Sequence, residues 1–186
     1  MDDHIIPECY IDTKLIKSIA PHLPKSNYNH QKGCSTVVKV MQENFDDNFA
    51  VGIVDRDKRE LEYAKKFKLI HEVDESLKLY RYKNHYLIFI IPAMEKWIIA
   101  RADEVGILLK SYNLPHDFRE LVKITKSSTS EKEDAHSQDF GRLFKELKKR
   151  NPPSVAILSF WIKYLKDNPY DADIEFIKSE TQRISS

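Results

Sequence analysis

The 186-residue sequence lacks several features that point directly to a class of protein. Its net charge is only +1, from 30 basic and 29 acidic side chains, so no overall basic field indicates a nucleic-acid-binding protein. Its two cysteines fit reduced thiols better than a disulfide framework. No apolar run is long enough to span a membrane, and the acidic N-terminus lacks a signal-peptide pattern. We therefore expect a cytoplasmic protein without a membrane partner.

The most informative segment is a short, β-branched run that leads into two carboxylates. Residues 49–54 are almost free of polar groups, which predicts a strand buried on both faces, as in a parallel sheet covered by helices. Asp55 and Asp57 follow at the carboxyl end of this strand, where such sheets bind ligands. Magnesium is usually held by one or two protein carboxylates. The pair indicates a Mg²⁺ or Mn²⁺ site, and a turn that caps the next helix is the alternative.

A further carboxylate ends the apolar segment that opens the chain. This segment predicts a short strand ending at Glu8, and Asp12 or Thr13 can cap the helix that follows. If the strand is parallel to the one before Asp55, Glu8 lies at the same edge of the sheet. Glu8, Asp55 and Asp57 would then converge as a metal-dependent phosphodiester reaction requires.

The order of these motifs resembles the Toprim domain of topoisomerases, primases and related nucleases. Members have a Glu that ends the first strand, an Asp four residues later and an Asp-x-Asp after the third strand, which correspond to Glu8, Asp12 and residues 55–57. Cys9 stands where the family usually has glycine. The Pro-x-x-Glu-x-Trp segment at residues 92–97 is similar to a segment of Toprim nucleases of the OLD and RloB type. The resemblance covers roughly the first hundred residues.

The resemblance implies a Mg²⁺- or Mn²⁺-dependent phosphodiesterase, an endonuclease on DNA or RNA. Asp55 and Asp57 would hold the cation, and Glu8 would be a further ligand or a general base. Related nucleases often serve phage defence or mobile elements, and such a setting is what the resemblance implies here. A partner ATPase and a homo-oligomer are both open, and the sequence does not decide between them. Two alternatives stay open. One is a non-catalytic interaction or regulatory subunit with this fold; the other is a receiver-like phosphotransfer domain, in which Asp55 is the acceptor and a later strand supplies a lysine.

Several other polar side chains are candidates for auxiliary roles around this site. A loop before Gly33 carries a histidine and a lysine that could touch a phosphate or move a proton, unless it is an ordinary surface connection. A lysine after the acidic pair could neutralise phosphate or lie on a solvated helix. A glutamate in the first turn of a later helix could bind the metal through water. The alternative is that it is there only because the helix dipole stabilises a negative charge at that end. Asp12, at the start of the first predicted helix, is a further auxiliary candidate. The full set of auxiliary candidates is Asp12, His30, Lys32, Lys58 and Glu95.

Strands alternate with helices, which predicts an α/β fold with a Toprim-like, Rossmann-like and mostly parallel sheet. Residues 77–82 and 86–91 predict a hairpin. The pattern after about residue 100 is helical. We expect an α/β domain over 1–105 and a helical extension over 106–186, with a flexible linker near 127–137. The sequence does not locate the second strand.

The helical half contains a basic cluster at the end of one predicted helix. Its members could contact a nucleic-acid backbone. The alternative is that they are simply stabilised by the negative end of the helix dipole. The low net charge favours the dipole explanation. The cluster consists of Lys145, Lys148, Lys149 and Arg150. Trp161 and Tyr164 could bind a partner protein if they are exposed.

Overall fold

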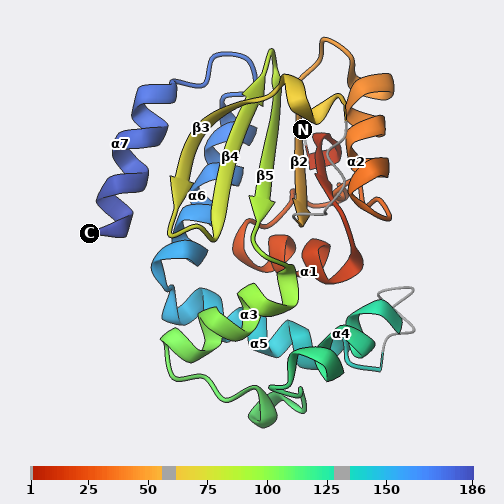
Figure 1. The fold of residues 1–186 in the computed structure, drawn as a ribbon, viewed down its shortest axis with the longest axis vertical. Coiled ribbons are helices and arrows are strands. Elements are labelled where there is room, and N and C mark those ends of the chain that lie inside the picture. Colours follow the sequence, from red (N-terminus) through yellow and green to blue (C-terminus); the bar gives the residue numbers. More distant parts are fainter. Residues whose placement is uncertain (1, 56–61, 128–134) are drawn as a thin grey trace.

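The computed structural model describes residues 2–55, 62–127 and 135–186, which form an α/β fold (Figure 1). The strands are β1 (Ile5–Pro7), β2 (Ala50–Asp55), β3 (Lys68–Val73), β4 (Leu77–Tyr82) and β5 (His85–Ile90). The α-helices are α1 (Tyr10–Ile19), α2 (Cys34–Val40), α3 (Met94–Glu104), α4 (Phe118–Ser127), α5 (Ser137–Arg150), α6 (Pro153–Asp167) and α7 (Ile174–Ser185). Short 3-10 or π turns are η1 (Asp2–His4), η2 (Met41–Phe45), η3 (Ala64–Lys66) and η4 (Leu109–Tyr112).

The described strands form a mixed sheet in the order β1-β2-β5-β4-β3. The pairs β1–β2 and β2–β5 are parallel, whereas β5–β4 and β4–β3 are antiparallel. The predicted parallel sheet is therefore confirmed for one half and corrected for the other. Residues 74–76 and 83–84 join β3, β4 and β5, and connections this short allow only antiparallel pairing.

The predicted hairpin is confirmed as β4 and β5, but β3 was missed by the sequence analysis. Most residues of β3 are at least partly exposed, so the strand has no apolar run that marks it. The predicted helix after Asp55 falls largely on residues 56–61, which lie outside the described residues. The described part of that region contains only the 3-10 turn η3.

A polar extended segment lies beside β1 on the side away from β2. The backbone N–H of Asn29 donates to Ile5 O at 2.9 Å, and that of Gln31 donates to Pro7 O at 3.0 Å. These two bonds cover the outer edge of β1. No described residue between α1 and α2 belongs to a strand, so the expected second strand is replaced by this segment, which is too polar to resemble a buried strand.

Helices cover both faces of the parallel strands, as the apolar β2 sequence predicts. Val51 and Ile53 belong to the apolar cluster shared with α1 and α6, whereas Ala50 and Val54 belong to the cluster shared with α2. A Cβ atom on Gly52 would lie 2.7 Å from Leu87 Cδ2. Glycine at this position therefore lets α2 and the neighbouring strand approach β2 closely.

The C-terminal half is helical, as predicted, and α5 and α6 share a hydrophobic cluster with the sheet. The division of the chain near residue 105 stays a prediction. Trp161 is fully buried and donates through Nε1 to Thr181 Oγ1 at 2.8 Å, so it is not available as an exposed partner-binding residue. In the part of the chain that the structure describes, no helix is long and apolar enough to cross a membrane.

Candidate functional site

Glu8 and Asp55 meet at the carboxyl edge of the parallel strands. The backbone N–H of Glu8 donates to Ile53 O at 3.0 Å and so extends the β1–β2 ladder by one residue. The backbone N–H of Asp55 in turn donates to Glu8 Oε2 at 2.9 Å. Because β1 and β2 are parallel, their ends present both carboxylates at one edge, as the sequence analysis expects.

A third carboxylate, Asp12, enters this site from the first turn of α1. Its residue is only 2% exposed. The sequence predicted Asp12 or Thr13 as the helix cap, but the cap is Cys9, whose Sγ accepts from the Asp12 N–H at 3.4 Å. Thr13 Oγ1 donates to the Cys9 carbonyl at 2.8 Å, inside the helix. Cys9 thus caps α1, and the Asp12 carboxyl group lines the pocket with the Cys9 thiol as a hydrogen-bonding neighbour.

The fourth carboxylate, Glu95, lies in the first turn of α3, just past β5. Thr125 Oγ1, from α4, donates a short hydrogen bond to Glu95 Oε1. This contact holds the carboxylate from the helical half of the chain. Trp97, two residues later in α3, is buried in the core and takes no part in the pocket.

These carboxylates surround one cavity of about 270 Å³. In Figure 1, α1, α3 and α4 lie at the end of the sheet to which the β2 and β5 arrows point. The lining combines the β1 and β2 ends, the start of α1, the loop before α2 and the neighbouring ends of α3 and α4. It consists of Glu8, Cys9, Tyr10, Asp12, His30, Lys32, Gly33, Asp55, Glu95, Thr125 and Lys126. We call this cavity the carboxylate pocket.

Burial and neighbouring charges make two of the pocket carboxyl groups, Asp12 and Asp55, hard to ionise. Burial raises the pKa of Asp55 to about 7; a hydrogen bond from the Met94 backbone opposes the rise, and the charges of Glu8 and Glu95 add to it. Burial also raises the pKa of Asp12 well above its ordinary value, with a further contribution from Asp55. One buried oxygen of each, Asp12 Oδ1 and Asp55 Oδ1, has no hydrogen-bond partner among the described residues.

Cationic and proton-carrying side chains line the same pocket. The His30 ring stacks on Tyr10 with centroids 3.9 Å apart, and His30 Nδ1 lies 3.3 Å from Thr13 Oγ1. Lys32 follows on the exposed loop, and Lys126 reaches the pocket from α4. The loop therefore opens at the edge of the sheet that holds Glu8 and Asp55, as predicted. Lysines at a pocket rim can bind anionic substrate oxygens.

Two predicted site residues, Asp57 and Lys58, lie outside the described residues. In the described ranges, no three His, Cys, Asp or Glu side chains are arranged as a ready-made set of metal ligands. This holds for the pocket carboxylates, and equally for Cys9, Cys34 and His30. Glu8 instead accepts from the Asp55 backbone. Binding of a cation by the described carboxylates would therefore require a side-chain rotation.

The predicted basic cluster divides into two parts. Lys145 and Lys148 line a second, larger hollow between α1 and α5. Lys149 and Arg150 are exposed at the end of α5 outside that lining, and Arg150 Nε pairs with Glu146 at 2.9 Å. The helix-dipole explanation fits the last turn of α5, which contains Lys148 and the two residues after it.

The predicted site residues omit five lining residues of the carboxylate pocket: Cys9, Tyr10, Gly33, Thr125 and Lys126. Tyr10 follows Glu8 closely, and its proximity to that carboxylate was a usable signal. Thr125 and Lys126 come from the helical half, and nothing in their local sequence pattern indicates contact with Glu95. Only the packing of α4 against α3 brings them there.

Comparison with known proteins finds no matching family model, no matching curated protein and no matching solved structure.

Proposed function

We propose that this chain is a Toprim-like, divalent-cation-dependent phosphodiesterase that acts as an endonuclease on DNA or RNA. The observation that carries the proposal is the convergence of Glu8, Asp12, Asp55 and Glu95 on one pocket at the carboxyl ends of parallel strands. Strongly perturbed carboxyl groups in a cleft are typical of functional sites. The order of the sequence motifs, which resembles that of Toprim domains, supports phosphodiester cleavage as the class of reaction.

The donor set fits Mg²⁺ or Mn²⁺. Hard cations take carboxylate oxygens, and the partnerless oxygens of Asp12 and Asp55 are buried at the pocket. A nearby cation would favour the ionised form of both groups and so oppose the effect of burial on their pKa. Asp55, Asp12 and Glu8 would hold the ion, and Asp57 is a further candidate. When bound, the ion neutralises charge on phosphoryl oxygens and acidifies a coordinated water.

Other residues of the carboxylate pocket would bind the substrate phosphate, accept a proton and position water. Lys32 and Lys126 would bind non-bridging phosphate oxygens at the rim of the pocket. Glu8 or His30 would accept the proton of the attacking water or hydroxyl, since both line the same cavity. Thr125 would keep Glu95 in place through its hydrogen bond. Glu95 would then orient water beside the ion.

The non-catalytic alternative, an interaction or regulatory subunit, draws support from the missing preformed ligand set among the described side chains. The receiver-like alternative is weaker, because the lysine after β5, Lys96, places its ammonium 4.9 Å from the Phe118 ring centroid and is absent from the pocket lining. A phage-defence setting, a partner ATPase and a cytoplasmic location stay predictions.

The test is calorimetric titration of Mn²⁺ and Mg²⁺ into wild type, Asp55→Asn and the exposed control Asp171→Asn, first alone and then with an oligonucleotide. We expect binding that Asp55→Asn abolishes and the control retains. The same proteins are then assayed for Mn²⁺-dependent cleavage of single- and double-stranded DNA and RNA. Metal binding that stays undetectable even with oligonucleotide present would overturn the phosphodiesterase and favour the interaction module.

A further inference from the structure

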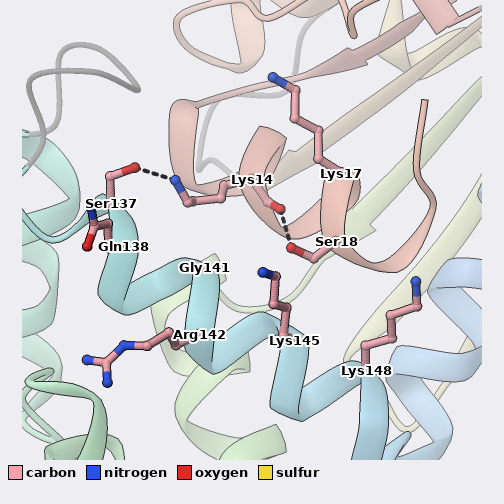
Figure 2. A pocket seen from close by; sticks show the side chains of 9 residues that line it. All are labelled: Lys14, Lys17, Ser18, Ser137, Gln138, Gly141, Arg142, Lys145 and Lys148. Carbon is pink, nitrogen blue, oxygen red and sulfur yellow. Dashed lines mark hydrogen bonds between the residues drawn. The ribbon is translucent and has the colours of Figure 1, made fainter. Parts of the chain in front are cut away.

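A basic hollow lies between α1 and α5, and α1 also contributes to the carboxylate pocket. The volume of the hollow is about 840 Å³, and no acidic side chain is among its lining residues. The lining contains five cationic side chains, two serines, a glutamine and a glycine. Figure 2 shows them: Lys14, Lys17, Ser18, Ser137, Gln138, Gly141, Arg142, Lys145 and Lys148. We call this hollow the basic groove.

Three of the four groove lysines, Lys14, Lys145 and Lys148, have no ion-pair partner among the described residues. Lys145 and Lys148 form no ion pair with any described residue, and both are exposed on α5. Lys14 donates to the Ser137 hydroxyl, which is uncharged. Arg142 differs, because its Nη2 pairs with Asp139 at 2.7 Å and Figure 2 shows it directed away from α1. Lys14 on α1 and Lys145 and Lys148 on α5 therefore carry positive charge that no described side chain compensates.

The positive charge continues from α5 to α6. Burial lowers the pKa of Lys163, and the positive charges of Lys148 and Lys166 lower it further. Lys166 is itself compensated by Asp2. Lysines this close repel one another, so an anion that bound between Lys148 and Lys163 would relieve the repulsion.

The groove and the carboxylate pocket share α1. Asp12 lines the pocket, whereas Lys14, Lys17 and Ser18 line the groove. A nucleic-acid strand with one phosphate at the carboxylate pocket would therefore reach the groove along α1.

We propose that the basic groove between α1 and α5 binds the sugar-phosphate backbone of the nucleic acid that flanks the phosphate held at the carboxylate pocket. The position relative to a scissile phosphate rests on the proposed function; the binding of the backbone does not. The groove has no aromatic lining residue, so it offers charge to phosphates but no platform for stacked bases. Binding is therefore independent of base sequence and depends strongly on salt.

Gly141 forms part of the groove wall and keeps it open. A Cβ atom there would lie 3.4 Å from Lys14 Cε across the two helices. An alanine is therefore accommodated, whereas a larger acidic side chain would occupy the groove and reverse its charge. Gly141→Glu thus tests the groove independently of the lysines, and Gly141→Ala is its matched control.

The experiment measures binding of a fluorescent oligonucleotide in EDTA, without divalent metal, over a range of salt concentrations. Lys145→Ala with Lys148→Ala is compared with Lys149→Ala with Lys110→Ala, which removes the same charge from exposed positions outside the groove. We expect the groove variant to bind about tenfold more weakly at low salt, with a salt slope reduced by about 1.5 to 2. The control should bind like wild type.

Three further results bear on the inference. An oligonucleotide with uncharged methylphosphonate linkages should bind wild type and groove variant equally weakly. Asp55→Asn should lose cleavage but keep binding, which separates failure of the phosphodiesterase from failure of the groove. Equal binding by the groove variant and its control overturns the inference, whatever the nuclease assay gives. Groove-dependent binding to phosphatidylserine vesicles but not to the oligonucleotide would overturn it in favour of a membrane surface.

Discussion

The Asp55 backbone N–H donates to the side chain of Glu8 at 2.9 Å and joins the ends of two parallel strands. This bond does more than align the strands. It fixes the Glu8 carboxylate beside the Asp55 carboxyl group, where its charge adds to the effect of burial on the Asp55 pKa. The pocket thus holds mutually repelling acids in a partly dry site, an arrangement that lowers the stability of the metal-free fold.

Asp55→Asn should stabilise the metal-free protein at neutral pH. The pKa of Asp55 is about 7 in the fold and 3.8 for an ordinary Asp. A raised carboxyl pKa favours the fold below about pH 4, and this contribution is lost as the pH rises through about 7. At pH 7.5 we therefore expect the variant to gain on the order of 2–4 kcal/mol in free energy of unfolding, since each pKa unit corresponds to about 1.4 kcal/mol.

Urea denaturation from pH 3.5 to pH 8 measures this effect. The gain should disappear below pH 4, and the exposed control Asp171→Asn should show none. Saturating Mn²⁺ should stabilise wild type but not Asp55→Asn, because a bound cation favours the ionised carboxylate. A variant that is no more stable than wild type at pH 7.5 would contradict the argument that Asp55 is held at a destabilising site.

Thr125→Val should weaken the attachment of α4 to the carboxylate pocket. The variant loses the hydrogen bond from Thr125 Oγ1 to Glu95 Oε1 while it keeps the shape of the side chain. We expect a loss of about 1.5–3 kcal/mol, because the acceptor is an acidic side chain. Thr125→Ser should keep the bond and most of the stability. Chemical denaturation measures both, and equal losses in the two variants would rule out the hydrogen bond as the cause.

Asp2→Asn should destabilise the fold by about 2 kcal/mol at pH 7. Asp2 is 2% exposed, pairs with Lys166, and accepts from the Leu23 N–H at 2.8 Å. Although burial tends to raise the pKa of Asp2, the partners outweigh it and lower that pKa to about 2. A depressed carboxyl pKa stabilises the fold above about pH 4, and the contribution is lost as the pH falls through about 2.

The loss in Asp2→Asn should therefore shrink as the pH is lowered from 7 toward 2. Urea denaturation across this range measures it. Asp3→Asn is the matched control, because the Asp3 side chain is 75% exposed. A loss that does not depend on pH would point to packing of the amide rather than to the lost charge.

Gly52→Ala should cost about 1–3 kcal/mol through overpacking. Its Cβ would lie 2.7 Å from both Leu87 Cδ2 and Met41 Sδ, closer than atoms in a core approach. Met41→Ala removes one of these neighbours. The double variant should lose less than the sum of the single losses, because the two sites are in contact. Additive losses in thermal or urea unfolding would show that the crowding is relieved elsewhere.

Local sequence patterns predicted the elements that have strong apolar signatures. The buried β2, the β4–β5 hairpin and the amphipathic C-terminal helices all have periodicities that their burial requires. The exposed β3 and the polar segment beside β1 have no such signature. Their backbones pair because neighbouring strands offer free hydrogen-bonding groups, which is a property of the assembled sheet.

The sequence by itself determined that Glu8 and Asp55 end apolar strands, and therefore that parallel strands would bring them to one edge of the sheet. Only the tertiary structure decided which other residues join them. Thr125 and Lys126 reach the pocket because α4 packs on α3, and Lys14 lines the same groove as Lys145 and Lys148 because α1 packs on α5. Helix packing places side chains that are distant in sequence next to one another, and no local pattern contains that information.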